Sequence, residues 1–137
     1  MKKSLFLIGF MLVLLPVFVS AATVEGTIQG LNCILNEKLC PVGQEDAVIS
    51  QEEFFVVYTN TQEYYFVPNL DRAVLARHIN TIVRVTGKLD KKHKVINAEK
   101  LEVLTKKKWV KAWSPKMEAE IQKYIYTPGY NVNPAPF

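Results

Sequence analysis

The sequence has few residues of the kinds that build catalytic or metal centres. Of its 137 residues only two are cysteine and two are histidine. It contains no C-x-x-C pair, no C-x-x-C-H haem-attachment motif, no G-x-S-x-G or H-E-x-x-H motif and no phosphate-binding glycine loop. These absences argue against dithiol redox catalysis, covalent haem binding, the common hydrolase classes and phosphate-loop enzymes. We therefore expect no catalytic residue, no bound metal and no cofactor, and interpret the chain as a protein that is not an enzyme.

The N-terminus carries the three-part pattern of a secretory signal peptide. Lys2 and Lys3 form a short positive region, an uncharged apolar run follows over residues 5–19, and small residues end it. This run is shorter than the ~20 residues that span a bilayer, and Pro16 interrupts it, so a retained anchor is the weaker alternative. We expect residues 1–22 to be a cleaved signal peptide. The mature protein would then be periplasmic or extracellular, and not an integral membrane protein.

Cleavage would also change the charge balance. It removes Lys2 and Lys3 and leaves 15 of the 17 basic residues against 13 acidic ones, so the formal net charge of +4 falls to about +2. A nearly neutral protein exerts little long-range attraction on polyanions. The charge balance therefore argues against nucleic acid as the main partner.

The two cysteines, Cys33 and Cys40, stand seven positions apart in the stretch GLNCILNEKLCPVG. Because exported proteins meet an oxidising environment, a disulfide between them is the simplest interpretation. In the chain-entropy model, closing so short a loop would stabilise the fold by about 2–3 kcal/mol. A metal site would need further ligands, and the only imidazoles available are those of His78 and His93.

Periodicity predicts five strands and one helix between residues 23 and 104. The strands are expected at residues 23–35, 53–59, 63–68, 81–90 and 95–104, with a long polar loop at 36–53 and a hairpin tip at 91–94. In the fifth strand the apolar parity switches between Ala98 and Leu101, which indicates a bulge. The stretch NLDRAVLARHIN, residues 69–80, has a helical period instead, with Asn69 as a candidate cap. His78 falls in its last turn, where the helix dipole would favour a protonated ring.

The order strand, long loop, strand, strand, helix, strand, strand is that of the OB-fold, a five-stranded Greek-key barrel. The segments VEGTIQGL, VRVTGKL and YYFVPNLDRAVLARHIN also look like parts of small OB-type domains. By strand order and glycine placement, residues 23–104 resemble the exported bacterial OB-fold domains. The resemblance implies a mainly β fold with short helices, an OB-like barrel with its helix between strands three and four. A barrel with another strand order and a flat α+β sheet remain as alternatives. OB domains accept many ligands, so the fold does not choose a function.

Residues 105–137 form a C-terminal segment outside the predicted barrel domain. It begins with lysines interleaved with Trp109 and Trp113. Ser114 and Pro115 are a typical helix start, with serine as the cap and proline at the first helical position. The helix would carry an apolar stripe of Met117, Ile121, Tyr124 and Ile125. Beyond it, a tail containing proline and glycine predicts an extended arm.

Strands two and three carry apolar or aromatic side chains on both faces, although a barrel has only one interior face. Two explanations are open. Either the helix after Ser114 folds back over the barrel, with Trp109 or Trp113 filling the seam, or the aromatic residues stay exposed as a stacking or docking surface.

We expect a non-catalytic exported binding or assembly protein, an accessory or structural subunit of a larger periplasmic complex such as a redox enzyme. Docking would use the C-terminal arm and the aromatic barrel face, on a protein partner or a second copy, unless the arm packs on its own barrel. The alternative is an OB-fold binder of an oligonucleotide or oligosaccharide that uses the face of strands two and three and the 90–94 loop. The candidate binding residues for both are Tyr58, Tyr64, Phe66, Lys91, Lys92, His93, Trp109, Trp113, Tyr126, Tyr130 and Phe137.

Overall fold

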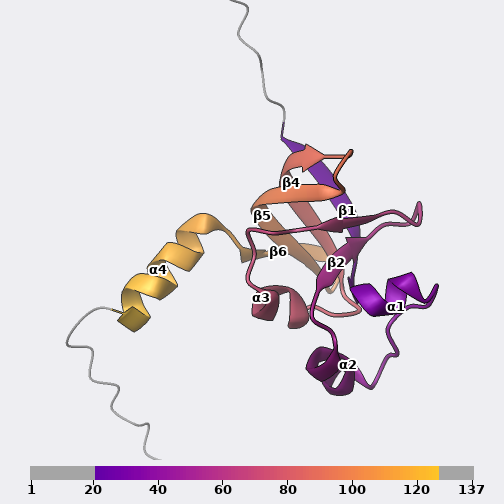
Figure 1. Ribbon diagram of the computed structural model, residues 1–137. Coiled ribbons are helices and arrows are strands. Elements are labelled where there is room, and N and C mark those ends of the chain that lie inside the picture. The colour runs from indigo at the N-terminus through magenta and orange to yellow at the C-terminus, as the bar shows by residue number, and fades with distance from the viewer. Residues whose placement is uncertain (1–20, 127–137) are drawn as a thin grey trace, which may run out of the picture.

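A computed structural model describes residues 21–126 of the chain (Figure 1). Residues 1–20 of the expected signal peptide and the expected extended arm, including Tyr130 and Phe137, lie outside these residues, whereas Ala22, the last residue of the expected signal peptide, begins the first strand. Among residues 21–126, none of the helices has the length and apolar character needed to cross a membrane.

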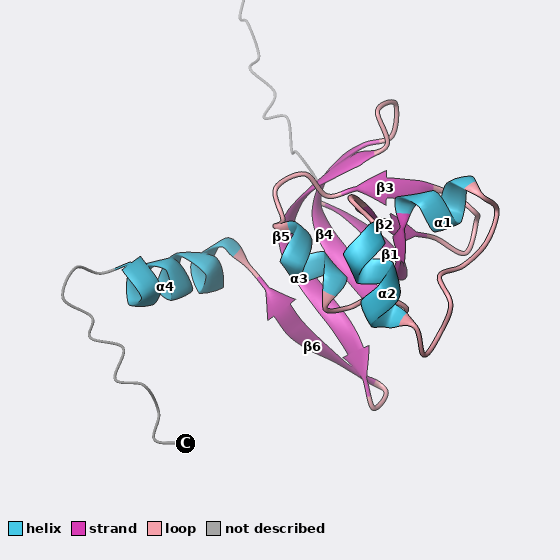
Figure 2. Cartoon of the chain, turned by 60° about the horizontal axis from the view of Figure 1, so that its bottom comes forward, coloured by secondary structure: helices cyan, strands magenta, loops and turns pink. Residues whose placement is uncertain are grey.

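The described chain is mainly β, as expected, with six strands and four short helices. In chain order the elements are β1 (Ala22–Gly30), α1 (Leu31–Leu35), α2 (Glu45–Gln51), β2 (Phe55–Tyr58), β3 (Tyr64–Phe66), α3 (Arg72–Ala76), β4 (Ile82–Asp90), β5 (Val95–Thr105), β6 (Lys108–Trp113) and α4 (Pro115–Tyr126). Figure 2 shows the three helices α1, α2 and α3 gathered at one end of the strands, while α4 lies apart from them.

All six strands belong to one sheet with the order β3-β2-β1-β4-β5-β6, and each neighbouring pair is antiparallel. β3 also pairs with β5, in parallel, through Phe66 and Val95. This additional pairing closes the five strands β1, β2, β3, β4 and β5 into a ring. The sixth strand, β6, extends the sheet beyond β5. Side chains of one parity therefore point into the ring, and those of the other parity point away from it.

The interior of the ring is filled by alternate residues of each strand, for example Val83 and Val85 on β4. On β5 the alternation of buried residues shifts by one position: Ile96 and Ala98 are buried before the shift, and Leu101 and Val103 after it. At this point Thr86 of β4 pairs with Lys100, while the next residue, Gly87, pairs with Ala98. Glu99 is thus the extra residue of a β-bulge, and the bulge expected between Ala98 and Leu101 is confirmed.

Three elements differ from the sequence expectation in the first half of the chain. The first strand ends at Gly30 rather than at residue 35, and Leu31–Leu35 forms α1. The long loop contains α2, with Glu45 and Asp46 in its first turn, where the helix dipole favours carboxylates. The central helix is shorter than predicted and is capped by Asp71, whose side chain accepts a hydrogen bond from Ala73 N.

Asn69 was expected to cap the central helix but bonds to the backbone of β5 instead. Its side-chain amide donates to the carbonyl of Ala98 at 2.7 Å and its side-chain oxygen accepts from the Ala98 N–H at 2.8 Å. These two bonds satisfy backbone groups next to the bulge, where the regular ladder is interrupted.

The basic and aromatic stretch after β5 was not expected to be a strand, yet it forms β6. Lys106 and Lys107 both have positive φ and make a two-residue turn, and β6 then pairs with β5 from Thr105 to Leu101. Trp113, at the end of β6, is buried in the core with 6% of its surface exposed.

Two explanations for the doubly apolar strands were open, and the structure does not show the first, in which the C-terminal helix folds back over the barrel. The helix begins at Pro115 as predicted, with the Ser114 hydroxyl accepting from Met117 N, but it projects away from the ring of strands (Figures 1 and 2). Only Ser114 separates β6 from α4, so the chain has no linker with which to reverse direction. The indole N–H of Trp113 also donates to Glu118 at 3.1 Å, which fixes the start of the helix at the end of β6.

Gly87 provides a test of the ring, because a Cβ at this position would lie 2.0 Å from the carbonyl oxygen of Asn97 on β5. We expect Gly87→Ala to lower the free energy of unfolding by about 1–3 kcal/mol, since the backbone must move to relieve the overlap. Lys88→Ala, at the exposed next position of the same strand, should change it by less than about 0.5 kcal/mol. Urea unfolding measures both, and equal midpoints for the two variants would contradict the close pairing of β4 and β5.

Candidate functional site

The outward face of β2 and β3 carries a row of three aromatic side chains, Tyr58, Tyr64 and Phe66, called here the aromatic row. Tyr58 lies opposite Tyr64 in the strand register. The rings of Tyr64 and Phe66 meet edge to face, with centroids 5.9 Å apart. All three side chains are half-buried. The residues of the other parity, such as Val57 and Tyr65, are buried in the interior of the ring, so the aromatic row cannot turn inward as well.

Two cavities flank the aromatic row. Tyr58 and Tyr64 line a groove of about 830 Å³, called here the tyrosine groove, between the β2–β3 hairpin and the segment that follows α1. The rest of its lining mixes apolar, amide and charged side chains: Ile34, Glu37, Lys38, Leu39, Thr59, Asn60 and Gln62. Phe66 lines a second cavity of about 630 Å³, which is mostly apolar and lies near α3. The three predicted aromatic residues therefore belong to two different depressions of the surface.

The hairpin tip after β4 places one lysine, Lys94, beside the aromatic row. Phe66 N donates to the carbonyl of Lys94 at 2.8 Å, and this bond holds the tip beside β3. The ammonium of Lys94 then lies 4.9 Å from the ring centroid of Tyr64, at a distance where a cation is attracted to the aromatic face. Lys91 and Lys92 are exposed.

His93 and Asp90 form a local pair within the same tip. The Nδ1 atom of His93 lies 2.7 Å from Oδ2 of Asp90, and the backbone N–H of His93 donates to the same carboxylate. These hydrogen bonds, that of the ring first, hold the pKa of Asp90 below its usual value. His93 is therefore engaged in closing the turn.

The two tryptophans of β6 lie apart from the aromatic row. Trp109 is half-buried and packs under the guanidinium of Arg84 on β4, at 4.1 Å from the ring centroid, and Arg84 is paired in turn with Glu25. Trp113 is a core residue, so its ring offers no surface to a partner. Tyr126 is the last residue of α4, and its side chain lies outside the described part of the chain.

The apolar stripe of α4 lies on the surface. Ile121 and Ile125 are 56% and 55% exposed, and Tyr124 is also exposed, while Met117 is half-buried near the start of the helix. The charged positions of the helix hold two lysines and two glutamates, Lys116, Glu118, Glu120 and Lys123. The helix is therefore amphipathic, but without an excess of either charge.

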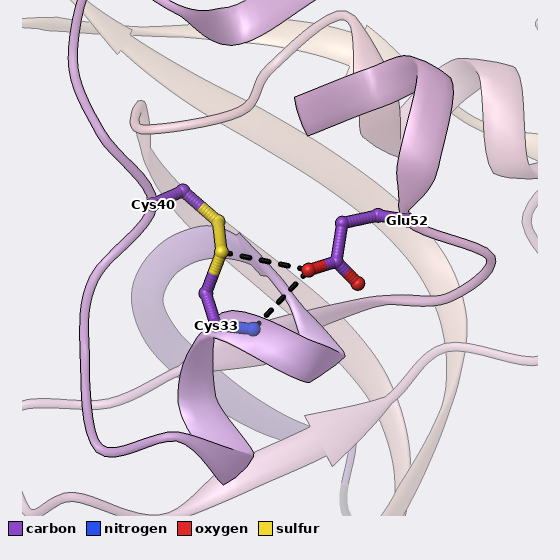
Figure 3. A group of neighbouring side chains, drawn as sticks. All are labelled: Cys33, Cys40 and Glu52. Carbon is purple, nitrogen blue, oxygen red and sulfur yellow. Dashed lines mark hydrogen bonds between the residues drawn. A yellow bond between two sulfur atoms is a disulfide. The ribbon is translucent and has the colours of Figure 1, made fainter. Parts of the chain in front are cut away.

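The two cysteines form the expected disulfide, with Cα atoms 5.5 Å apart. This bond indicates an oxidising, non-cytoplasmic environment. Cys33 is half-buried in α1 and Cys40 is 3% exposed. Figure 3 shows the carboxylate of Glu52 beside the two sulfur atoms.

Glu52 is a buried carboxylate that sequence reasoning placed only in the long polar loop at 36–53. It is 6% exposed, and its oxygens accept hydrogen bonds from the backbone N–H groups of Asn32 and Cys33, both at 3.1 Å, and from the Asn32 side chain. The first turn of a helix has backbone N–H groups without a partner inside the helix, and Glu52 accepts from two of these groups in α1. This explains why the chain becomes helical after Gly30. A single glutamate in a polar loop carries no sequence signal for burial.

His78 lies just beyond α3 and is half-buried. Burial, with a smaller contribution from the neighbouring charge of Arg77, lowers the pKa of His78. The expectation of a ring protonated by the helix dipole is therefore wrong. The cost of burying a charge outweighs the dipole of a helix that spans only five residues.

Family models, curated proteins and solved structures were each compared with the chain, and none of them matches it. The candidate residues above are therefore assigned by their own geometry.

The lowered pKa of His78 predicts a pH dependence of stability. The unfolded chain takes up the proton near the ordinary value of about 6.5, whereas the folded chain takes it up only at lower pH. Below about pH 6.5 the unfolded state therefore binds more protons, and the free energy of unfolding falls as the pH falls. Between about pH 7.5 and 5, the free energy of unfolding measured with urea should therefore fall less in His78→Gln than in the wild type. In Arg77→Gln the free energy of unfolding should fall by an intermediate amount, because this variant removes only the smaller cause of the lowered pKa, the charge of Arg77. Identical pH profiles for the wild type and the two variants would contradict this account.

Proposed function

We propose that this chain is a non-catalytic exported binding or assembly protein, an accessory subunit that docks on a larger complex through α4. The observation that carries the proposal is the apolar stripe of α4, which projects from the ring of strands with Ile121 and Ile125 more than half exposed. Burying two isoleucine side chains would stabilise a contact by several kcal/mol before the costs of association. Within residues 21–126, the strands and the other helices leave Ile121 and Ile125 more than half exposed.

The charges of α4 favour a protein partner over a membrane surface. Helices that lie on anionic lipid carry many lysines or arginines on their polar face. The polar positions of α4 hold equal numbers of lysines and glutamates, and Lys116 and Glu120 pair with each other at 4.0 Å. An apolar groove of a protein that receives a helix needs no basic face, so we assign α4 to this mode of recognition.

The ring of strands supports an OB-like Greek-key barrel as the scaffold of this docking module. The parallel pairing of β3 with β5 and the position of α3 between β3 and β4 are arrangements that such a barrel requires. Export is supported by the disulfide, together with the signal peptide expected from the sequence.

Ile121→Glu tests the docking surface. Because Ile121 is exposed, the substitution should change the free energy of unfolding by less than about 0.5 kcal/mol while it places a charge in the contact. The tagged full-length protein is expressed in its native host and exported. We expect the wild type to capture a defined partner and the variant to bind that partner at least ten times more weakly, as measured with the purified pair.

The control is Gln122→Glu, which introduces the same residue one position along the helix, outside the stripe. It should retain the partner. If the partner is retained by both variants, or lost from both, docking through the stripe is wrong. If the only partner captured is a second copy of the chain, the proposal narrows to self-association, and sedimentation of the purified protein decides it.

A second candidate function is favoured by the tyrosine groove. The half-buried rings of Tyr58 and Tyr64, the amide side chains of Asn60 and Gln62 in the lining and the ammonium of Lys94 beside the ring of Tyr64 would suit an extended ligand of sugar rings or bases. This is the alternative binder, an OB-like domain that takes an oligosaccharide or oligonucleotide on the face of β2 and β3.

Tyr64→Ala tests this second function. In titrations with neutral oligosaccharides and with a single-stranded oligonucleotide, loss of one stacked ring should weaken the affinity about 5- to 150-fold, which corresponds to the ~1–3 kcal/mol measured for stacked bases. Trp109→Ala, at a half-buried aromatic outside the groove, should leave it unchanged. An affinity that falls steeply with salt would identify the oligonucleotide, and one that is independent of salt would identify the sugar. If the wild type binds neither ligand, this second candidate function is wrong.

A further inference from the structure

We propose that reduction of the disulfide between Cys33 and Cys40 creates a metal site. In this site the two thiolates and the carboxylate of Glu52 bind one thiophilic divalent cation of the zinc class. The three side chains come from α1, from the loop after it and from the residue that follows α2 (Figure 3). One ligand atom from each lies within 4.8 Å of the other two. This inference is independent of docking through α4.

Both cysteines are held in place by hydrogen bonds that do not involve the S–S bond. Cys33 donates its backbone N–H to Oε1 of Glu52 at 3.1 Å. The backbone N–H of Cys40 donates to the side-chain oxygen of Gln29 at 2.7 Å, and the Gln29 amide is bonded to Asn80 at 3.0 Å. Gln29 is itself buried. We therefore expect the two sulfur atoms to stay opposite each other when the bond between them is broken.

The spacing and the chemistry of the three groups fit a zinc-class ion. Bonds of about 2.3 Å to sulfur and 2.0–2.2 Å to oxygen in a tetrahedral site place neighbouring ligand atoms roughly 3.3–3.8 Å apart. Oε1 of Glu52 already lies 3.5 Å from the sulfur of Cys33. The two sulfur atoms are bonded to each other in the oxidised protein, so after reduction side-chain rotation must move them apart to this separation. Two thiolates select zinc, cadmium or cobalt over calcium and magnesium, which prefer oxygen.

The surroundings orient the ligands and leave one coordination position open. Asn32 bonds through its backbone and side-chain nitrogens to Oε2 of Glu52, which leaves Oε1 directed toward the sulfur of Cys33 at 3.5 Å. The N–H of Gly30 lies 3.1 Å from the sulfur of Cys40 and would stabilise a thiolate there. Cys33 is half-buried and gives the ion and a fourth, water ligand their route from solvent.

The disulfide and the metal site exclude each other. An external dithiol reduces the protein with two electrons: its thiolate attacks one sulfur, the S–S bond breaks, and the dithiol closes to its own disulfide. Cys33 and Cys40 are left as thiols, and binding of the divalent cation releases their two protons. In the oxidised protein the sulfurs carry no thiolate charge. Only the reduced protein should therefore hold the ion.

The test uses the full chain, oxidised or reduced with excess dithiol, and desalted without oxygen. The probe is Co²⁺, followed by displacement with Zn²⁺. We expect the reduced protein to bind one Co²⁺ per chain with a thiolate-to-cobalt charge-transfer band and the ligand-field bands of a tetrahedral site. The oxidised protein should show neither band. Far-UV circular dichroism records whether the reduced protein keeps its fold.

Glu52→Gln and Glu53→Gln form the matched pair of variants. Glu52→Gln removes one charged ligand and should weaken binding of Zn²⁺ at least tenfold, whereas Glu53→Gln, at the exposed neighbouring position, should leave it unchanged. Cys40→Ser, which keeps the loop but removes one of the two thiolates, should weaken binding of Co²⁺ and lower the charge-transfer absorption per bound ion by about half. The inference is overturned if the reduced protein unfolds, if the oxidised form binds equally well, or if both glutamate variants match the wild type.

Discussion

The structure depends on one constraint: a closed ring of strands has a single interior face. Because side chains alternate along a strand, β2 and β3 can place only one parity in that interior, and Val57 and Tyr65 take it. Tyr58, Tyr64 and Phe66 are therefore directed outward. Trp113 completes the core from β6, and α4 then projects away from the ring instead of packing on this outward face. Both candidate functions use side chains that this constraint leaves outside.

The helical end of the ring is organised around Glu52. Its carboxylate holds the first turn of α1 beside the disulfide, and its carbonyl accepts hydrogen bonds from Nε and Nη2 of Arg72 at 3.2 and 2.8 Å. Arg72 also bonds to the carbonyl of Ile49 and lies over the ring of Phe55. Glu52 thus connects α1, through its carboxylate, with α3, through its backbone carbonyl, at the end of α2. Its carboxylate also lies next to the two sulfur atoms. Once the disulfide is reduced, these three side chains can act together as metal ligands.

Features set by local sequence could be predicted, and those set by distant contacts could not. The five strands of the ring, the bulge at Glu99 and the helix start at Ser114 each follow from a pattern of neighbouring residues. α1 and β6 do not. α1 depends on a carboxylate twenty positions away, and β6 depends on a turn in which Lys106 and Lys107 adopt the conformation that glycine and asparagine usually provide. Tyr58 and Tyr64 were predictable by parity, whereas the approach of Lys94 to Tyr64 required the pairing of the tip with β3.

The central claim, that α4 holds Ile121 and Ile125 away from a ring whose interior is already full, can be measured directly in solution. In the monomeric full-length protein with labelled isoleucine methyl groups, nuclear Overhauser effects report which side chains lie next to Ile121 and Ile125. The account predicts none between these methyl groups and the rings of Tyr58, Tyr64 or Phe66. Such contacts in the monomer would show that the helix covers the aromatic row itself, and they would contradict the account.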